Sequence, residues 1–297
     1  MPTMSFTDLT KHYGPVKALD GFTVDIASGR ITAFLGANGS GKTTSMRLLL
    51  GLSEPTSGSA TIDGRAYRDL AEPTRVVGAV LDQGFHPNRN ARNHLRIAAA
   101  QANVSASRIP VVLELVGLTE AADRRVGGYS LGMRQRLALA SALIGDPTIL
   151  VLDEPFNGLD PEGITTLRNF LRHFADSGGT VFLSSHLLAE VAHSADDAVI
   201  IDHGRLVASS PVATLVAGTS TAVITTPDVD VLTAALQARG GTVTRTGPDQ
   251  VTVTGLVRDV IGRTAAGAGV VILDMRGDGD DLETIFAALI NDKERPS

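Results

Sequence analysis

The segment that most restricts the fold of this chain is GANGSGKTT, which begins at Gly36. It fits the phosphate-loop pattern GxxxxGK[ST], in which glycines let the backbone turn so that successive N–H groups point at phosphate oxygens. A compact apolar run, RITAFL, precedes the loop, and a helix-forming run, KTTSMRLLLGL, follows it. A strand, a phosphate loop and a helix in this order predict an α/β nucleotide-binding core, with either ATP or GTP as the nucleotide.

The side chains of the loop match the chemistry of a nucleoside triphosphate. Lys42 is expected to contact the β and γ phosphates, and the Thr43 hydroxyl is expected to bind Mg²⁺. The other loop residues expected to surround the phosphates are Gly36, Ala37, Asn38, Gly39, Ser40, Gly41 and Thr44.

A second part of the site is predicted from TILVLDEP, an unbroken apolar run that ends in two acids. Such a run suits a strand buried on both faces of a parallel sheet, which places Asp153 at the C-terminal edge of that sheet. There a carboxylate can hold Mg²⁺ through water. Glu154 is then placed to orient and deprotonate an attacking water. The alternative role of Glu154 is structural, as an acidic residue that caps a helix ahead of Pro155.

Composition limits the classes of function. Lys and Arg total 26 against 32 Asp and Glu, and the net charge of −6 argues against a general nucleic-acid binder. The chain has no cysteine, which excludes disulfides and thiolate metal sites and favours a cytosolic setting. No apolar run approaches the roughly 18–20 residues that span a bilayer, so a membrane role would require a partner.

The sequence predicts two domains, residues 1–218 and 219–297. Strand and helix patterns alternate in the first, which predicts a parallel sheet. In the second, the strand-like runs AVITTP, GTVTRT, QVTVTG and VVILDM are interleaved with helical patterns, the last of which is DDLETIFAALIND. This predicts a small C-terminal α+β domain, joined near AGTSTA, with a docking or regulatory role.

A second glycine-lined helix start, VGGYSLGMRQRLALA, begins at Val126. A helix N-terminus offers free backbone N–H groups and a positive dipole end to an anion. Ser130 adds a hydroxyl and Gly132 an open backbone, but this segment has neither a lysine nor a metal ligand. It is therefore expected to form only half of an anion site.

Taken together, these motifs are similar to the nucleotide-binding domain of ABC (ATP-binding cassette) ATPases, from Tyr13 to about Ser210. SLGMRQRLALASALIGDPTILVLDEP resembles the signature helix of that family running into its Walker B strand. NGLD, residues 157–160, resembles the D-loop, and SSH, which ends at His186, resembles the segment that carries the switch histidine of the family. The resemblance implies a parallel sheet, an N-terminal antiparallel β part and a helical signature subdomain over about residues 85–140.

The resemblance also implies roles for single residues. Tyr13 would stack on the adenine, and His186 would hydrogen-bond the γ-phosphate and keep the water aligned with Glu154. The signature residues Ser130 and Gly132 would cap the γ-phosphate of ATP bound to a second subunit arranged head to tail, and Asp160 would reach across the seam. The expected assembly is an obligate dimer, taken as a homodimer, with two ATP molecules and Mg²⁺ between its subunits.

Two segments depart from the pattern of the family. The usual LSGGQ is replaced by Tyr129-Ser130-Leu131-Gly132-Met133, which keeps the serine and the second glycine. The Q-loop glutamine aligns with either Asp82 or Gln83, and we assign it to Gln83 as a metal ligand and catalytic residue. The catalytic set expected from the resemblance is Lys42, Gln83, Glu154 and His186, and the metal set is Thr43, Gln83 and Asp153.

SLGM and DEPFNGLDPEGI resemble the ATPase subunits of bacterial exporters of the bacitracin, lantibiotic and anthracycline-resistance type. The resemblance implies ATP hydrolysis coupled to a separate polytopic permease, for efflux of a drug, antibiotic peptide or lipid-like substrate, with the ATPase peripheral on the cytoplasmic face. Arg89, Arg92 and Arg96, read as helically spaced, would face that permease or acidic headgroups, or else form a solvated face. The alternative function is an ABC-type ATPase of a non-transport assembly with a soluble partner.

Overall fold

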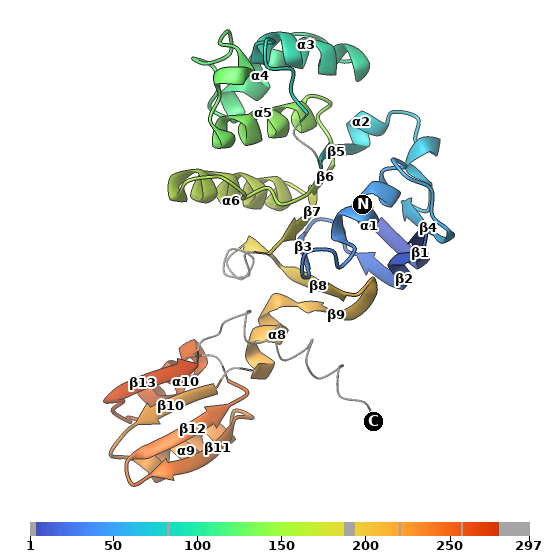
Figure 1. The fold of residues 1–297 in the computed structure, drawn as a ribbon. Coiled ribbons are helices and arrows are strands. Elements are labelled where there is room, and N and C mark those ends of the chain that lie inside the picture. The colour runs from blue at the N-terminus through green and yellow to red at the C-terminus, as the bar shows by residue number, and fades with distance from the viewer. Residues whose placement is uncertain (1–3, 82–83, 187–193, 220, 257, 279–297) are drawn as a thin grey trace. The chain divides into compact units, whose positions relative to one another are not determined.

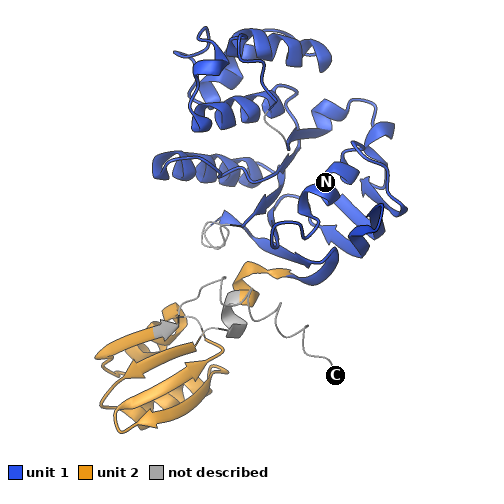
Figure 2. Cartoon of the chain, viewed as in Figure 1, with its two compact units in different colours: residues 1–187, 193–209 blue, residues 188–192, 210–297 orange. Residues whose placement is uncertain are grey.

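The computed structural model describes residues 4–81, 84–186, 194–219, 221–256 and 258–278 (Figure 1). The chain forms two compact units, one of residues 1–187 with 193–209 and the other of residues 188–192 with 210–297 (Figure 2). In the structure, the second unit begins after Ser209, before helix α8 (Val212–Thr219). The boundary predicted from the sequence, between residues 218 and 219, lies at the end of that helix.

A six-stranded sheet forms the centre of the first unit, in the order β5-β6-β7-β3-β8-β9. The pairs from β5 through β8 are parallel. The strands are β5 (Val77–Val80), β6 (Ile149–Leu152), β7 (Thr180–Ser185), β3 (Ile31–Leu35), β8 (Asp197–Asp202) and β9 (Arg205–Pro211). The side chains of β6 are at most 1% exposed, so the apolar run of TILVLDEP is a strand covered on both faces, as predicted.

A three-stranded antiparallel sheet, in the order β2-β1-β4, packs on the same core. Its strands are β1 (Met4–Tyr13), β2 (Val16–Ile26) and β4 (Ser57–Ile62). Phe6 and Phe22 of this sheet contact Phe182 and Phe34 of the parallel sheet, with ring centroids 5.5–6.0 Å apart. Helix α1 (Lys42–Leu49) adds Met46 and Leu49 to the core. The parallel sheet with its antiparallel β part confirms the predicted fold class.

Short helices separate β4 from β6 along the chain. They are the 3-10 turns η1 (Tyr67–Asp69) and η2 (Val126–Gly128) and the helices α2 (Pro73–Val76), α3 (Ala91–Gln101), α4 (Arg108–Leu115) and α5 (Leu131–Leu143). The Asn90 side chain caps α3 by accepting a hydrogen bond from the Asn93 N–H. Arg92 and Arg96 lie on α3, as predicted, and Arg92 pairs with Asp123 at 3.0 Å. Arg89 precedes the helix, so its predicted place in the same helical row is wrong.

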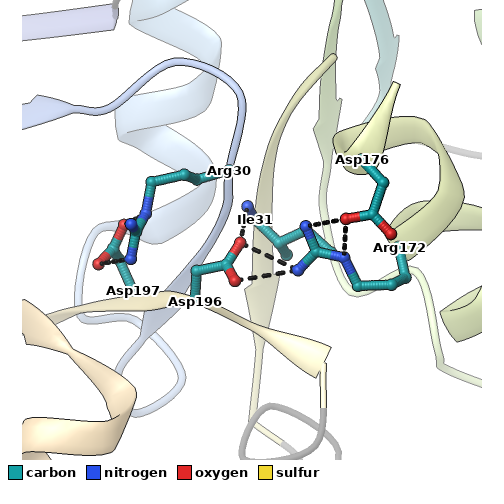
Figure 3. Close-up of polar contacts among 6 residues, drawn as sticks. All are labelled: Arg30, Ile31, Arg172, Asp176, Asp196 and Asp197. Atoms are coloured by element: carbon teal, nitrogen blue, oxygen red, sulfur yellow. Dashed lines mark hydrogen bonds and ion pairs between the residues drawn. The ribbon is translucent and has the colours of Figure 1, made fainter. Parts of the chain in front are cut away.

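Helix α6 (Pro161–Asp176) is held to the sheet at its C-terminal end by charged groups (Figure 3). Arg172 donates to Asp176 at 2.9 Å and to Asp196 at 2.9 Å, and Asp196 also accepts the Ile31 N–H at 2.9 Å. Arg30 pairs with Asp197 at 2.6 Å. These contacts join the end of α6 to the first residues of β3 and β8.

The second unit contains a βαββαβ arrangement, the ferredoxin-like order of elements. The elements are β10 (Thr221–Thr225), α9 (Val229–Gln237), β11 (Thr242–Gly247), β12 (Gln250–Thr254), α10 (Arg258–Gly267) and β13 (Asp274–Asp278). The sheet order is β11-β12-β10-β13, with every pair antiparallel. Its core includes Ile224, Leu232 and Val251.

One strand of this unit differs from the prediction. The strand expected over VVILDM begins only at Asp274, and Val271 and Leu273 are 57% and 66% exposed. The apolar composition of that run was therefore misleading. The helix expected over DDLETIFAALIND lies outside the described residues. Among the described residues, no helix combines the length and apolar character needed to cross a membrane.

Candidate functional site

The phosphate loop runs from the end of β3 to the start of α1, and its shape requires glycine at two positions. A Cβ atom at Gly36 would lie 2.4 Å from the Ile201 carbonyl oxygen. Gly41, the N-cap of α1, has φ +112° and a Cβ there would lie 2.6 Å from the Ala18 carbonyl oxygen. Both positions therefore exclude a side chain, and the loop leaves the N-terminus of α1 open toward a ligand.

Lys42 lies almost buried within this loop, at 6% exposure. Its Nζ donates to the carbonyl oxygens of Gly36 at 2.7 Å and Ala37 at 3.1 Å. Burial lowers the pKa of Lys42, and the charges of Glu154 and Asp153 oppose that shift. A buried ammonium bonded mainly to neutral carbonyls is a site that an anionic phosphate would stabilise further.

Asp153 is fixed from two sides at the end of β6. The Thr43 hydroxyl donates to Asp153 Oδ2 at 2.6 Å, and the Ser184 hydroxyl donates to Asp153 Oδ1. Ser184 also accepts the Glu154 N–H at 2.9 Å. Ser184 is fully buried in β7 and was not predicted as a site residue, although it lies within the SSH segment.

Glu154 and His186 are brought together at the same edge of the sheet. His186 Nδ1 lies 2.8 Å from Glu154 Oε2, and the His186 N–H donates to that oxygen at 3.4 Å. Glu154 has φ +49°, a left-handed conformation uncommon for a residue with a side chain. The next helix begins at Pro161 and is capped by Asp160, so the alternative of Glu154 as a helix cap is wrong.

We call the group formed by Lys42, Thr43, Asp153, Glu154, Ser184 and His186 the phosphate cluster. Within it, a hydroxyl and a carboxylate oxygen from Thr43 and Asp153 are the hard donors that Mg²⁺ prefers. The Ser40 hydroxyl is buried in the loop and has no hydrogen-bond partner among the described residues. This unpartnered polar atom and the two glycines fit a loop shaped for a phosphate ligand. Asp82 and Gln83 lie outside the described residues.

Tyr13 lies outside the phosphate cluster, at the end of β1. Its side chain is 50% exposed, and Lys11 Nζ lies 5.0 Å from the centroid of its ring. An exposed aromatic face is compatible with the predicted stacking on adenine, which remains a prediction.

The predicted signature and D-loop residues form a second group, the signature cluster of Ser130, Leu131, Gly132, Gly158 and Asp160. Ser130 caps α5, its Oγ accepting the Met133 N–H at 3.2 Å, and Asp160 caps α6 by accepting the Gly163 N–H at 3.0 Å. Leu131 lies over Gly158, where a Cβ would be 2.0 Å from Leu131 Cδ2. Among the described residues, no hydrogen bond joins Ser130, Gly132 or Asp160 to the phosphate loop.

Comparison with known families is consistent with this arrangement. The family model described as ABC transporter matches residues 19–157, and one described as domain of unknown function DUF8746 matches residues 220–283. A solved chain titled as the ATP-binding subunit of an ABC transporter has a TM-score of 0.65 and 27% identity, covering 71% of this chain and 91% of that one. The fold is also that of the ATP-binding cassette MJ0796 bound to ADP and Pi, with a TM-score of 0.64, 22% identity, and coverage of 70% and 98%.

Curated relatives are similar over the first unit. The bacitracin transport ATP-binding protein BcrA of Bacillus licheniformis is 43% identical over 209 residues, which is 69% of this chain and 68% of the relative. The lantibiotic transport ATP-binding protein SrtF of Streptococcus pyogenes is 39% identical over 207 residues, 69% of this chain and 89% of the relative. Because the family model and these relatives match the unit that contains the phosphate loop, the chain belongs to the ABC transporter family of ATP-binding proteins, and is one of its ATPases.

Proposed function

We propose that this protein hydrolyses ATP at the seam of a head-to-tail homodimer and thereby drives a separate membrane permease that exports a drug, an antibiotic peptide or a lipid-like substrate. The observation that carries the proposal is the separation of two incomplete half-sites within one subunit. The phosphate cluster has the ammonium, the carboxylates and the hydroxyl that bind a nucleotide and Mg²⁺. The signature cluster has a capped helix N-terminus and no cation of its own.

In the phosphate cluster, Lys42 and the loop N–H groups bind the β and γ phosphates. Thr43 and Asp153 are the residues that would hold Mg²⁺, with Gln83 as a further ligand, and the bound ion would neutralise charge on the phosphate oxygens. Glu154 accepts a proton from the water that attacks the γ-phosphorus, and the leaving group is ADP. His186 holds the Glu154 carboxylate through the 2.8 Å contact. The Ser184 hydroxyl donates to the Asp153 carboxylate and accepts the Glu154 N–H beside it.

At the seam, the signature cluster supplies the remaining groups. The Ser130 oxygen accepts the Met133 N–H, which leaves its own O–H free to donate to a γ-phosphate held by the second subunit. The N-terminus of α5 and the Gly132 backbone add dipolar N–H groups at the same place. Asp160 already caps α6 through Oδ1, so we assign its cross-seam contact to Oδ2.

The permease side of the proposal rests on the relatives and on the surface of the helical part. The relatives named above are transport ATP-binding proteins for bacitracin and for a lantibiotic. Near α3, Arg96 is exposed and Arg124 and Arg125 extend the basic surface, whereas Arg92 is paired with Asp123. We assign this surface to the permease, which would place the protein peripherally on the inner face of the membrane.

A mixing experiment tests the two half-sites directly. Lys42→Ala subunits and Ser130→Arg subunits are each expected to be inactive as pure dimers. When the two are mixed, the heterodimer has one intact site, formed by the loop of the Ser130→Arg subunit and the signature of the Lys42→Ala subunit. With random pairing and independent sites, about a quarter of wild-type turnover should return. The double variant Lys42→Ala/Ser130→Arg mixed with inactive Lys42→Ala is the control and should restore nothing.

If mixing restores no turnover although heterodimers form, as shown by affinity tags of two kinds, the composite site is wrong. The permease is tested separately by purifying the native complex from detergent-solubilised membranes. Recovery of a polytopic membrane protein in fixed ratio to the ATPase supports the exporter. Recovery of a soluble scaffold instead would favour the alternative, an ATPase of a non-transport assembly.

A further inference from the structure

A cavity in the first unit lies between the helical part and α6, and Leu152 and Pro155, the residues on either side of Asp153 and Glu154, are among those that line it. Its volume is about 730 Å³, within the range of about 300–1,000 Å³ that is usual for small-molecule sites. One wall is formed by the end of α4 and one side of α5, and the other by the first turns of α6. The cavity is therefore large enough for an organic molecule rather than for a few waters.

The walls of the cavity expose apolar side chains that a soluble surface would ordinarily cover. Leu115 is 52% exposed and Leu131 is 55% exposed, and both line the cavity. Phe170 of α6 lines the opposite wall with an aromatic ring. Exposed leucines gathered in one concave site indicate a ligand with an apolar body.

The charged residues that line the cavity indicate which charge that ligand carries. Its described lining residues include three carboxylates, Glu114, Asp160 and Glu162, and one guanidinium, Arg136. Arg136 donates to the Gly117 carbonyl at 3.4 Å, and Glu114 and Glu162 are exposed and have no ion pair among the described residues. Two unpaired carboxylates on opposite walls favour a cation between them, and an aromatic ring adds attraction for the same charge.

We propose that this cavity binds an amphipathic organic cation, with its apolar body against Leu115, Leu131 and Phe170 and its positive charge near Glu114 and Glu162. All five residues of the signature cluster line the cavity, and Leu131 lies over Gly158 of the D-loop, so an occupant would touch the surface that the proposed function places at the dimer seam. The binding itself requires no nucleotide and no second subunit, so it can be tested independently of that function.

The test compares two ions of nearly the same shape and opposite charge, tetraphenylphosphonium and tetraphenylborate, by isothermal titration calorimetry on the full chain without nucleotide. Tetraphenylphosphonium is expected to bind saturably at one site per chain. Tetraphenylborate is expected to bind at least about tenfold more weakly, because the carboxylates repel it. Equal affinity for the two ions, or binding that does not saturate, would overturn the proposal.

Two variants locate the site. Leu115→Trp fills the cavity from the α4 side and Thr166→Trp fills it from the α6 side, and each should weaken tetraphenylphosphonium binding at least about tenfold. Leu52→Trp is the matched control, since Leu52 is 65% exposed and does not line the cavity. Circular dichroism on each variant confirms that it is folded. Wild-type affinity in both folded tryptophan variants would place the binding elsewhere and reject the site.

The charge assignment has its own variant. Glu114→Gln/Glu162→Gln should weaken tetraphenylphosphonium binding about fivefold and strengthen tetraphenylborate binding, so that the two ions converge. Glu120→Gln, an exposed carboxylate outside the cavity, should change neither affinity. If the double variant keeps the full preference for the cation, the role given to these carboxylates is wrong.

Discussion

Lys42, in the phosphate cluster, is 6% exposed and Ser184 is fully buried, whereas Ser130 and Asp160 of the signature cluster lie at the surface. In the phosphate cluster, side chains bond to one another, as in the contacts from Thr43 and Ser184 to Asp153. In the signature cluster, side chains cap their own helices. The first is thus organised within one subunit for chemistry, and the second offers helix ends that a neighbour can use.

Among the substitutions that test the two clusters, Glu154→Gln is expected to have the largest effect on ATP turnover. An amide keeps the size and one acceptor of the carboxylate but cannot take a proton from water, so turnover should fall about 100-fold or more while ATP still binds. The signature cluster is untouched, so ATP should close the dimer and hold it closed. Size-exclusion chromatography with ATP measures the dimer, with Glu120→Gln as control. Normal turnover would remove Glu154 from the catalytic role.

A smaller loss, about tenfold in kcat, is expected for Ser184→Ala. The change removes the hydroxyl that donates to Asp153 and accepts the Glu154 N–H, so both acids lose their fixed position. KM for ATP should change less than kcat, and Ser184→Thr, which keeps the hydroxyl, should restore most of the activity. Ser141→Ala, which removes a hydroxyl bonded to Leu137 within α5, is the control. An equal effect of Ser184→Ala and Ser141→Ala on kcat would show that Ser184 is merely structural.

The signature cluster is tested by Gly158→Ala. The added methyl would collide with Leu131, and φ +75° strains any side chain there, so the D-loop should shift and the ATP concentration for half-maximal dimerisation should rise several-fold. Adding Leu131→Ala removes the collision and should recover part of this loss, the remainder being the cost of the backbone conformation. Binding of ATP to the monomer, measured by fluorescent nucleotide, should stay near wild type. If Leu131→Ala recovers nothing, the contact between the two loops has no role in dimerisation.

The two clusters also differ in how far the sequence predicts them. Lys42, Thr43 and Asp153 come together because each lies in a local pattern, a glycine loop or a strand that ends in acid, whose geometry follows from its own residues. The role of Ser184 depends on the register of two parallel strands, in which Leu152 pairs with Leu183 and so brings Asp153 beside Ser184. No pattern within either strand encodes that register.

The contact of Leu131 with Gly158 likewise arises only when α5 and the D-loop pack together. In the second unit, the threonine-rich strands were expected from composition, but their order, β11-β12-β10-β13, depends on pairing between residues as far apart along the chain as Thr221 and Asp278. Strand composition also misplaced the last of these strands, because the apolar residues Val271 and Leu273 lie at the surface just before it begins.

The smallest expected effect concerns pH and the buried charge of the phosphate cluster. Burial lowers the pKa of Lys42 in the folded protein, whereas the unfolded chain keeps the ordinary value of about 10.5. Between these two values the unfolded state binds more protons, so this residue makes the folded state more stable as pH rises. Lys42→Met abolishes that contribution, and the melting temperature of wild type minus that of the variant should increase from about pH 8 to pH 10. If the difference in melting temperature instead falls as the pH rises, the charges of Glu154 and Asp153 raise the pKa of Lys42 by more than burial lowers it.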